Sequence, residues 1–236
     1  MAAMVLLDFG GTLDADGLPW VAQFFAAYRD EGGQVAEPAF TSAFSQSDEA
    51  LAGTPGIREL GFRATLLKQA ELLSERLPRN PPQFERVAEQ VHRNALATVE
   101  RNRRVLEALR VDGHRLGVVS NFTGNLDCCL DELGLTEYFD VTVDSALVGH
   151  AKPDERIFRA AEEALDISPS EEGRWMVGDN PEADIRAAAR LGFCTVWLAP
   201  AWRRLPADLK PTARISALTD LPGIIRRHER AHSRRG

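Results

Sequence analysis

Two patterns of hydrophobic and polar positions divide the chain. Short apolar runs flanked by glycine or polar residues indicate buried strands, and they occur at residues 4–7, 116–119, 139–143, 175–177 and 194–198. Between the later runs, apolar residues recur at spacings of three and four, which predicts helices. Apolar strands that alternate with helices are typical of a parallel sheet covered on both faces. The sequence therefore predicts an α/β core.

The segment from Trp20 to about Val99 shows only the helical pattern, broken by glycine and proline, which predicts a small helical bundle inserted into this core. In its first helix Trp20, Phe24, Phe25 and Tyr28 form a stripe that we expect to pack inside the bundle. The C-terminal arginines predict a frayed, solvated tail. The predicted division is a core of residues 1–14 and 98–225, a helical insertion of residues 15–97 and an arginine-rich tail of residues 226–236.

Composition narrows the function classes. The chain has 236 residues, with 35 acidic against 28 basic side chains and a formal charge of −7. This charge argues against a nucleic-acid binder, because such affinity comes from neutralising phosphates. No apolar run reaches the roughly 18 residues of a membrane span, so we expect no membrane contact and a cytoplasmic protein. The three cysteines, Cys128, Cys129 and Cys194, are too few and too unevenly spaced for a disulfide framework or a zinc site.

Candidate chemistry follows the predicted strands. In parallel sheets ligands bind beyond the carboxyl ends of the strands, so polar residues there are expected to converge. Two or three carboxylates, a lysine and a hydroxyl at one edge would suit a divalent cation and a phosphoryl group. A carboxylate there can also act as a nucleophile. The residues concerned are Asp8, Gly10, Gly11, Thr12, Ser120, Asn121, Lys152, Asp179, Asn180 and Asp184.

At these positions the sequence resembles the haloacid dehalogenase-like hydrolase superfamily. Its motifs appear in order at Val5 to Leu13, Val118 to Asn121, Gly149 to Phe158 and Val177 to Asp184. The resemblance implies a Rossmann-like parallel sheet core and a mobile α-helical cap formed by the insertion. It also implies hydrolysis of a small phosphorylated metabolite, and leaves the substrate and the oligomeric state open.

The resemblance assigns a role to each motif residue. Asp8 is expected to attack phosphorus and form an aspartyl-phosphate, while Lys152 neutralises the developing charge. Asp184 is expected either to bind the metal directly or to orient it. The expected Mg²⁺ ligands are Asp8, Gly10 through its main-chain carbonyl, Asp179 and Asp184. The expected phosphate ligands are Gly11, Thr12, Ser120, Asn121 and Lys152.

Residue 10 departs from the phosphatase pattern. Phosphatases of this superfamily carry a second aspartate two residues after the nucleophile, where it protonates the leaving alcohol and later activates water, but here the residue is Gly10. General acid and base catalysis contributes typically ~10²–10⁴-fold in rate. Asp14, Asp16, Asp48 and Glu49 are candidate substitutes, although the first pair is typical of a turn and the second of a solvated helix face.

Four functions remain open on this basis. We favour an atypical Mg²⁺-dependent phosphatase. The alternative from another class is a catalytically impaired relative that binds a phosphorylated ligand or a protein partner. A phosphonate-cleaving enzyme would need a lysine early in the cap, where the insertion offers only the later Lys68. A dehalogenase would not need the metal-binding form of the fourth motif, which is present as Gly178-Asp179 and Asp184.

Overall fold

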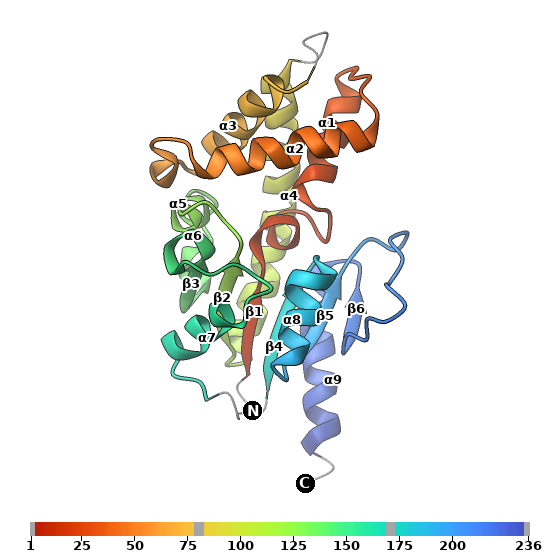
Figure 1. Ribbon diagram of the computed structural model, residues 1–236. Helices are drawn as coiled ribbons and strands as arrows, with labels where there is room; N and C mark the ends of the chain where they lie inside the picture. The colour runs from red at the N-terminus through yellow and green to blue at the C-terminus, as the bar shows by residue number, and fades with distance from the viewer. Residues whose placement is uncertain (1–2, 78–82, 169–172, 234–236) are drawn as a thin grey trace.

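A six-stranded parallel sheet forms the centre of the protein (Figure 1). The computed structural model describes residues 3–77, 83–168 and 173–233. The strand order is β3-β2-β1-β4-β5-β6, so the first strand lies in the middle of the sheet. The strands are β1 (Met4–Leu7), β2 (Arg115–Ser120), β3 (Val141–Asp144), β4 (Arg174–Gly178), β5 (Cys194–Leu198) and β6 (Ala213–Ile215).

Helices cover both faces of this sheet, as its uninterrupted apolar strands require. In β1, Val5 and Leu7 join one buried cluster, whereas Met4 and Leu6 join another, because alternate side chains point to opposite faces. The first cluster includes residues of α4 (Phe84–Val111), α5 (Leu126–Glu132) and α9 (Leu221–Ser233). The second includes residues of α7 (Glu155–Ala164) and α8 (Ala187–Arg190). This arrangement confirms the predicted α/β class.

The short connecting helices lie between these elements. They are η1 (Phe9–Leu13), η2 (Ile57–Glu59), η3 (Thr136–Tyr138), α6 (Ser145–Val148), η4 (Pro181–Arg186) and η5 (Leu218–Asp220). The predicted helix after the fourth strand begins as η4 and continues as α8. The sequence pattern does not predict strand β6, because three residues are too short to show a period.

The helical insertion lies over the carboxyl ends of the strands (Figure 1). It consists of α1 (Trp20–Asp30), α2 (Glu37–Ala52), α3 (Phe62–Ser74) and the first part of α4. A core of fully buried aromatic and aliphatic side chains, including Phe24, Phe40 and Leu66, holds these helices together. Because Phe24 and Tyr28 are buried here, part of the predicted stripe packs inside the bundle as expected.

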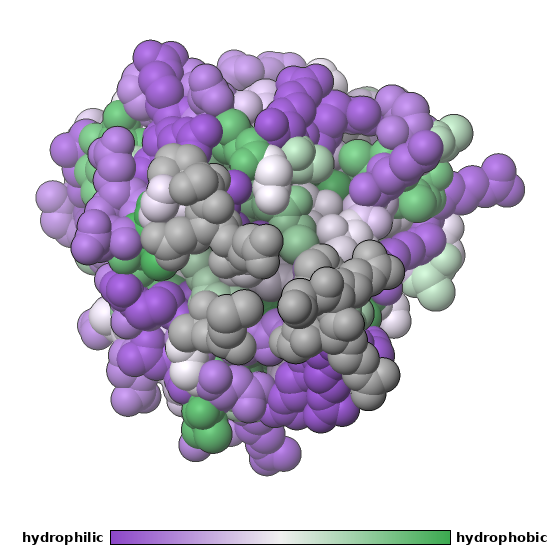
Figure 2. Space-filling view, turned by 90° about the horizontal axis from the view of Figure 1, so that it is seen from below, coloured by the Kyte–Doolittle hydropathy of each residue, from purple (hydrophilic) through white to green (hydrophobic). Residues whose placement is uncertain are grey.

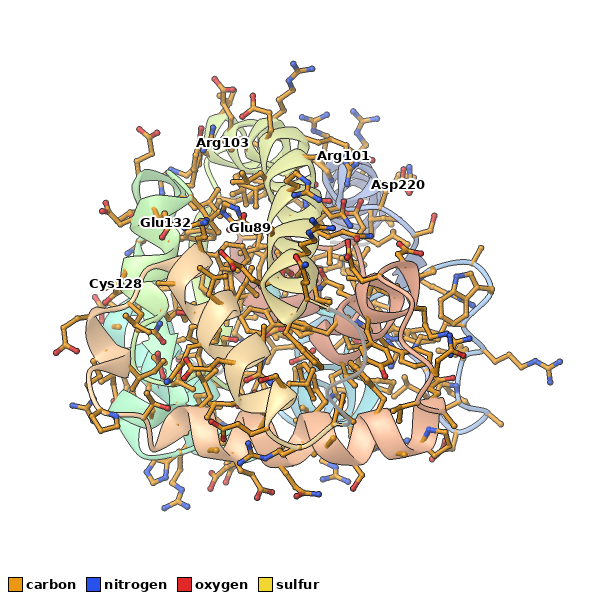
Figure 3. The ribbon with its side chains drawn as sticks, turned by 90° about the horizontal axis from the view of Figure 1, so that it is seen from above. Glu89, Arg101, Arg103, Cys128, Glu132 and Asp220 are labelled. Atoms are coloured by element: carbon orange, nitrogen blue, oxygen red, sulfur yellow. The ribbon has the colours of Figure 1, made fainter. Side chains whose placement is uncertain are left out.

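The insertion also rests on α5 of the core. Asn125, just before α5, donates from Nδ2 to the Leu60 carbonyl at 2.8 Å and to Thr65 Oγ1 at 2.7 Å. Glu132 at the end of α5 accepts from the Arg63 backbone N–H at 3.1 Å. Figure 3 shows Cys128 and Glu132 along this helix at the side of the insertion. These contacts define one side of the space between insertion and sheet.

Helix α4 crosses the predicted division at residue 98. It runs unbroken for 28 residues, from the insertion down to the start of β2. The sequence of this stretch contains neither glycine nor proline, and its apolar stripe stays in phase from Val87 and Val91 to Leu106 and Leu109. The insertion and the core therefore share one helix.

Arg226, Arg227 and Arg230 lie in a helix with their side chains exposed, so the predicted tail is solvated here as expected, but it is not frayed over residues 226–233. Helix α9 extends to Ser233 because Leu221 and Ile225 are fully buried against the core. Arg226 also donates from Nε to Asp112 Oδ2 at 2.8 Å. The remaining tail residues, 234–236, lie outside the described part of the chain.

The face at the amino ends of the strands, opposite the insertion, is mostly hydrophilic where described residues are visible (Figure 2). Within the described residues, no helix is both long and apolar enough to cross a membrane.

A buried ion pair joins α7, which follows Lys152, to β4, which leads to Asp179. Glu162 accepts from Arg174 on β4 and, through its other oxygen, from Arg159 on its own helix. The side chain of Arg159 is 35% exposed, whereas that of Arg174 is 7% exposed. Arg174 has further contacts, including a hydrogen bond to the Leu191 carbonyl at 3.1 Å, but loss of its buried carboxylate partner still removes most of the compensation of its charge. An exposed ion pair contributes little to stability.

We therefore predict that Glu162→Ala lowers the free energy of unfolding by about 3–5 kcal/mol. Arg159→Ala, which removes only the exposed partner of the same carboxylate, is expected to cost less than about 1 kcal/mol. Urea denaturation followed by circular dichroism measures both. Equal losses in the two variants would contradict the assignment of the stability to the buried pair.

Candidate active site

Three neighbouring strands deliver polar side chains to one edge of the sheet. Asp8 follows β1, Ser120 is the last residue of β2, and Asp179 follows β4. Leu7 is in register with Val118 of β2 and with Val177 of β4, so these strands end at nearly the same level. The parallel order of the strands therefore brings together residues that lie far apart in the sequence.

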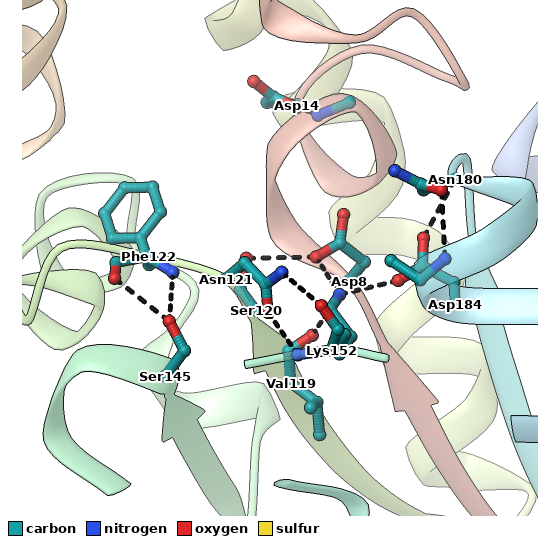
Figure 4. A network of polar contacts seen from close by, with 12 residues as sticks. Asp8, Asp14, Val119, Ser120, Asn121, Phe122, Ser145, Lys152, Asn180 and Asp184 are labelled. Atoms are coloured by element: carbon teal, nitrogen blue, oxygen red, sulfur yellow. Dashed lines mark hydrogen bonds and ion pairs between the residues drawn. The ribbon is translucent and has the colours of Figure 1, made fainter. Parts of the chain in front are cut away.

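The ammonium group of Lys152 is the centre of this arrangement (Figure 4). Its Nζ lies 2.6 Å from Asp8 Oδ1 and 2.7 Å from Asp184 Oδ1, and it donates to the Val119 carbonyl at 2.8 Å. Burial alone would lower the pKa of Lys152, but the carboxylates of Asp184 and Asp8 outweigh it and raise the pKa above its ordinary value. The lysine is therefore a fixed positive charge beside Asp8.

Ser120 and Asn121 support this pair in different ways. Ser120 is buried, and its Oγ donates to Asp8 Oδ1 at 3.0 Å. Asn121 donates from Nδ2 to the Lys152 carbonyl at 2.9 Å and accepts the Lys152 N–H on Oδ1 at 2.7 Å. Asn121, predicted as a phosphate ligand, thus clamps the backbone that presents Lys152.

Asp8, Asp179 and Asp184 form a buried cluster of carboxylates. One oxygen from each lies within 4.8 Å of the others. Burial raises the pKa of Asp179 and of Asp184, and the neighbouring carboxylates raise both further, whereas Lys152 opposes the rise. Concentrated negative charge of this kind suits a hard divalent cation with oxygen ligands. These residues, with the main-chain carbonyl of Gly10, could hold Mg²⁺.

The backbone around Asp184 is shaped to admit its carboxylate. Asp184 Oδ2 accepts the Asn180 N–H at 2.9 Å. A Cβ on Gly178 would lie 2.2 Å from the same oxygen, so only glycine fits at the end of β4. Asn180 in turn accepts the N–H groups of Glu182 and Ala183 at 3.0 Å. The fourth motif therefore fixes Asp184 beside Lys152.

Gly11 and Thr12, also predicted as phosphate ligands, are placed differently. The Gly11 N–H donates to Asp14 Oδ1 at 2.6 Å. Thr12 is fully buried, and its hydroxyl has no hydrogen-bond partner among the residues that the structure describes. In this conformation the loop after β1 therefore turns these groups toward the protein interior.

A cavity of about 560 Å³ opens between this edge and the insertion. The core side contributes Asp8, Gly10, Ser120 and Lys152 together with the fourth-motif residues. The insertion contributes residues of α1 and α2 and the residue before α1, which are Pro19, Trp20, Val21, Thr41, Phe44, Ser45, Asp48, Glu49, Leu51 and Ala52. The cavity is thus charged at its floor and mixed aromatic and polar along its upper wall.

Two of the four candidate substitutes for the missing acid line this cavity, and two do not. Asp48 and Glu49 of α2 line it. Asp16 instead pairs with Arg101 and accepts the Leu218 N–H. Asp14 is buried, and burial raises its pKa to about 7 although its hydrogen bonds from Trp20 and Gly11 oppose the rise.

Sequence reasoning missed most of the cavity wall outside the motifs, and Arg203 and Trp20 are the examples with the clearest contacts. Arg203 donates from Nη1 to the Asp179 carbonyl at 2.9 Å and stacks over Trp197, with its guanidinium 5.6 Å from the ring centre. No motif or periodicity marks it, since it lies in an irregular segment after β5. Trp20 was expected inside the bundle but lines the cavity, because it is the first residue of α1 and faces the loop after β1.

Comparison with known proteins agrees with this geometry. A family model of haloacid dehalogenase-like hydrolases matches residues 3–192, well over half of the chain. The chain belongs to this family. Fold neighbours include a HAD phosphatase from Thermococcus onnurineus (TM-score 0.54, 23% identity, covering 95% of this chain and 98% of that one). Another is the L-2-haloacid dehalogenase of Xanthobacter autotrophicus with chloropropionic acid covalently bound (TM-score 0.59, 17% identity, covering 96% and 99%).

Curated relatives of this HAD-like hydrolase include phosphatases. Pyrimidine 5'-nucleotidase YjjG of Escherichia coli is 34% identical over 125 residues, which are 52% of this chain and 55% of the relative. Phosphoserine phosphatase of Thermus thermophilus is 36% identical over 88 residues, 37% of this chain and 34% of the relative. The chain thus spans about half or less of the length of these relatives.

The carboxylate cluster predicts that Mg²⁺ stabilises the protein. At about 100 times its Kd, a ligand that binds only the folded state adds about 2.7 kcal/mol to the free energy of unfolding. Asp179→Asn is expected to abolish most of this gain and to leave the metal-free protein no less stable, because it removes a buried charge. Melting curves with and without Mg²⁺ measure both effects.

Asp131→Asn, which alters an exposed carboxylate on α5, is the control and should retain the full gain. An unchanged Mg²⁺ response in Asp179→Asn would place the cation elsewhere.

Proposed function

We propose that this HAD-like hydrolase is a Mg²⁺-dependent phosphatase that hydrolyses a small phosphomonoester through an aspartyl-phosphate on Asp8. The observation that carries the proposal is the 2.6 Å contact between Lys152 Nζ and Asp8 Oδ1 inside a buried carboxylate cluster. The relatives that are phosphatases or nucleotidases support the same reaction class.

The chain's own groups prepare Asp8 for attack on an anion. A carboxylate approaches a phosphoryl group only if the charge of both is offset, and preorganised electrostatics is the main contribution in phosphoryl transfer. Lys152 supplies a fixed positive charge, and Ser120 holds the orientation of the Asp8 carboxylate through its hydroxyl. The Asn121 clamp keeps Lys152 in place without using its ammonium.

Asp8, Asp179, Asp184 and the Gly10 carbonyl are the groups that would hold Mg²⁺. When bound, the cation would supply positive charge for the phosphoryl oxygens. Asp184 also contacts Lys152, so it contributes to positioning the lysine whether or not it binds the metal directly.

The helical insertion would act as the cap. Its helix α2 faces the floor of the cavity with Thr41, Ser45 and Asp48, so it lies where the part of the substrate beyond the phosphate would be. Closure of such an element excludes water and selects the substrate. A small phosphorylated metabolite fits the size of the cavity.

The same geometry weakens two of the alternatives. Lys68, the lysine that a phosphonate-cleaving mechanism would require, forms an ion pair with Glu71 on α3 at 2.9 Å and is outside the cavity lining. A dehalogenase binds no metal, so it would not need the cluster of three buried carboxylates that Asp8 forms with Asp179 and Asp184. A binding protein without turnover remains the rival, and experiment separates it from the enzyme.

We predict that the protein releases phosphate from members of a phosphomonoester panel in the presence of Mg²⁺. Asp8→Asn should reduce turnover by about 10³-fold or more, because the amide is a poor nucleophile for phosphorus. Lys152→Ala should reduce it by about 10²–10³-fold through lost charge stabilisation. Released phosphate measures turnover, and circular dichroism confirms that each variant is folded.

Lys68→Ala is the matched control, because it removes the same side chain from the surface of the insertion and should retain wild-type activity. Turnover that survives in Asp8→Asn would refute the mechanism. Binding of the same esters without any turnover would establish the binding protein instead.

A further inference from the structure

The space beside Gly10 is already filled. A Cβ built on Gly10 would lie 3.3 Å from Trp20 Nε1 and 3.6 Å from two further atoms of the indole. Even a Cβ requires the ring to shift by a few tenths of an ångström, so a longer side chain that extends toward Trp20 would have to displace the ring. The absence of an acid at residue 10 therefore leaves no empty space on this side of the residue, because the indole of Trp20 occupies it.

Trp20 is held in this position by several contacts. Its Nε1 donates to Asp14 Oδ2 at 2.7 Å, and the other oxygen of Asp14 accepts the Gly11 N–H at 2.6 Å. The indole also makes edge contacts with Phe62 and Phe122, with ring centres 6.0 and 5.8 Å apart. Moving the ring would break the bond to a buried carboxylate, which is costly. Trp20 is therefore a fixed wall.

This wall faces the part of the cavity beyond Asp8. Trp20, Phe44 and Phe122 all line the cavity, and they offer apolar ring surface on which a flat group can pack. The charged residues of the floor lie at the other end, around Asp8 and Lys152. A phosphate on the floor would thus extend its leaving group along aromatic surface.

We propose that Trp20 determines the specificity of this site and that the substrate is the phosphate ester of a phenol-like hydroxyl. The inference rests on the phosphatase function proposed above. A phenolic oxygen has a pKa of about 10, lower than that of an alkyl alcohol, and so leaves as an anion more readily. The ring of such a substrate packs on Trp20, and its departure needs no acid at residue 10.

The reaction balances without a general acid. An oxygen of Asp8 forms a bond to phosphorus while the ester P–O bond breaks, and the electron pair leaves with the phenolate, which takes its proton from solvent. Water then bonds to the phosphorus, the bond to Asp8 breaks, and the Asp8 carboxylate is restored as the proton of the water passes to solvent. The second leaving group is a carboxylate, which is weakly basic and needs no proton.

The test is a series of aryl phosphates of graded phenol pKa, together with alkyl phosphates, assayed at fixed Mg²⁺. We expect kcat/KM to fall steeply as the leaving-group pKa rises, with aryl esters ahead of alkyl esters by about 10²–10⁴-fold, the usual contribution of a general acid. Trp20→Ala should raise KM for aryl esters by about tenfold or more. Trp202→Ala, which removes a tryptophan that is 74% exposed, should leave kcat/KM across the series and KM for aryl esters unchanged.

Restoring an acid separates the role of Trp20 from that of Gly10. Gly10→Asp alone should give no gain on alkyl esters, because the indole occupies the space. The double variant Gly10→Asp with Trp20→Ala should raise alkyl-ester turnover by at least tenfold and flatten the dependence on leaving-group pKa. If Trp20→Ala fails to fold, Trp20→Leu replaces it in the double variant, because it also removes the indole atoms nearest to residue 10, and the same gain on alkyl esters is expected.

Three outcomes overturn the proposal. One is equal turnover of alkyl and aryl esters by the wild-type protein. Another is a large gain on alkyl esters from Gly10→Asp alone. The third is a shallow leaving-group dependence that becomes steep in Asp48→Asn, since this would show that α2 supplies the acid. In all three cases esters are still hydrolysed, so the phosphatase function survives, whereas turnover of no ester at all would refute that function itself.

Discussion

The ammonium of Lys152 is the interaction on which the candidate site depends. It joins Asp8 after the first strand to Asp184 after the fourth, and its own backbone is held by Asn121 after the second. Three buried carboxylates face two cations, Lys152 and Arg203, whose Nη1 lies 3.6 Å from Asp179 Oδ2, so the cluster keeps an excess of negative charge. Burial of unpaired charge is costly, and the raised pKa values of Asp179 and Asp184 express that cost. A bound cation would offset this excess of negative charge.

Much of this arrangement could be predicted from the sequence because the relevant signals are local. Each strand that supplies a functional residue is a short apolar run, and Asp8, Ser120 and Asp179 stand directly at its end. A parallel sheet brings such ends to one edge, whatever the distance along the chain. The convergence of these residues with Lys152 therefore required only the strand order and the position of each motif.

The features that sequence reasoning missed depend on contacts between distant segments. Nothing in the spacing of Gly11 and Thr12 reveals that Asp14 takes the Gly11 N–H and that the loop turns inward. Arg203 reaches Asp179 from an irregular segment. The arginines at residues 226, 227 and 230 are exposed as predicted, but they form a helix, because Leu221 and Ile225, which precede them, anchor it in the core. The predicted division at residue 98 falls inside helix α4, because no glycine, proline or change of apolar period marks where this helix passes from the insertion to the core.

The hydrogen bond between Trp20 and Asp14 attaches the first residue of the insertion to the core. By position Trp20 starts the insertion, yet its indole is bound to the loop that carries Asp8 and Gly10. Trp20 and Phe122 of the aromatic wall are therefore fixed to the core side, whereas Phe44 lies on α2 together with the polar residues Thr41, Ser45 and Asp48. Any movement of α2 relative to the sheet would change the polar contacts of a leaving group while its packing on the indole stays fixed. The fixed indole of Trp20 would then select substrates by the shape and chemistry of the leaving group, and the polar residues of α2 would select them by their hydrogen-bonding groups.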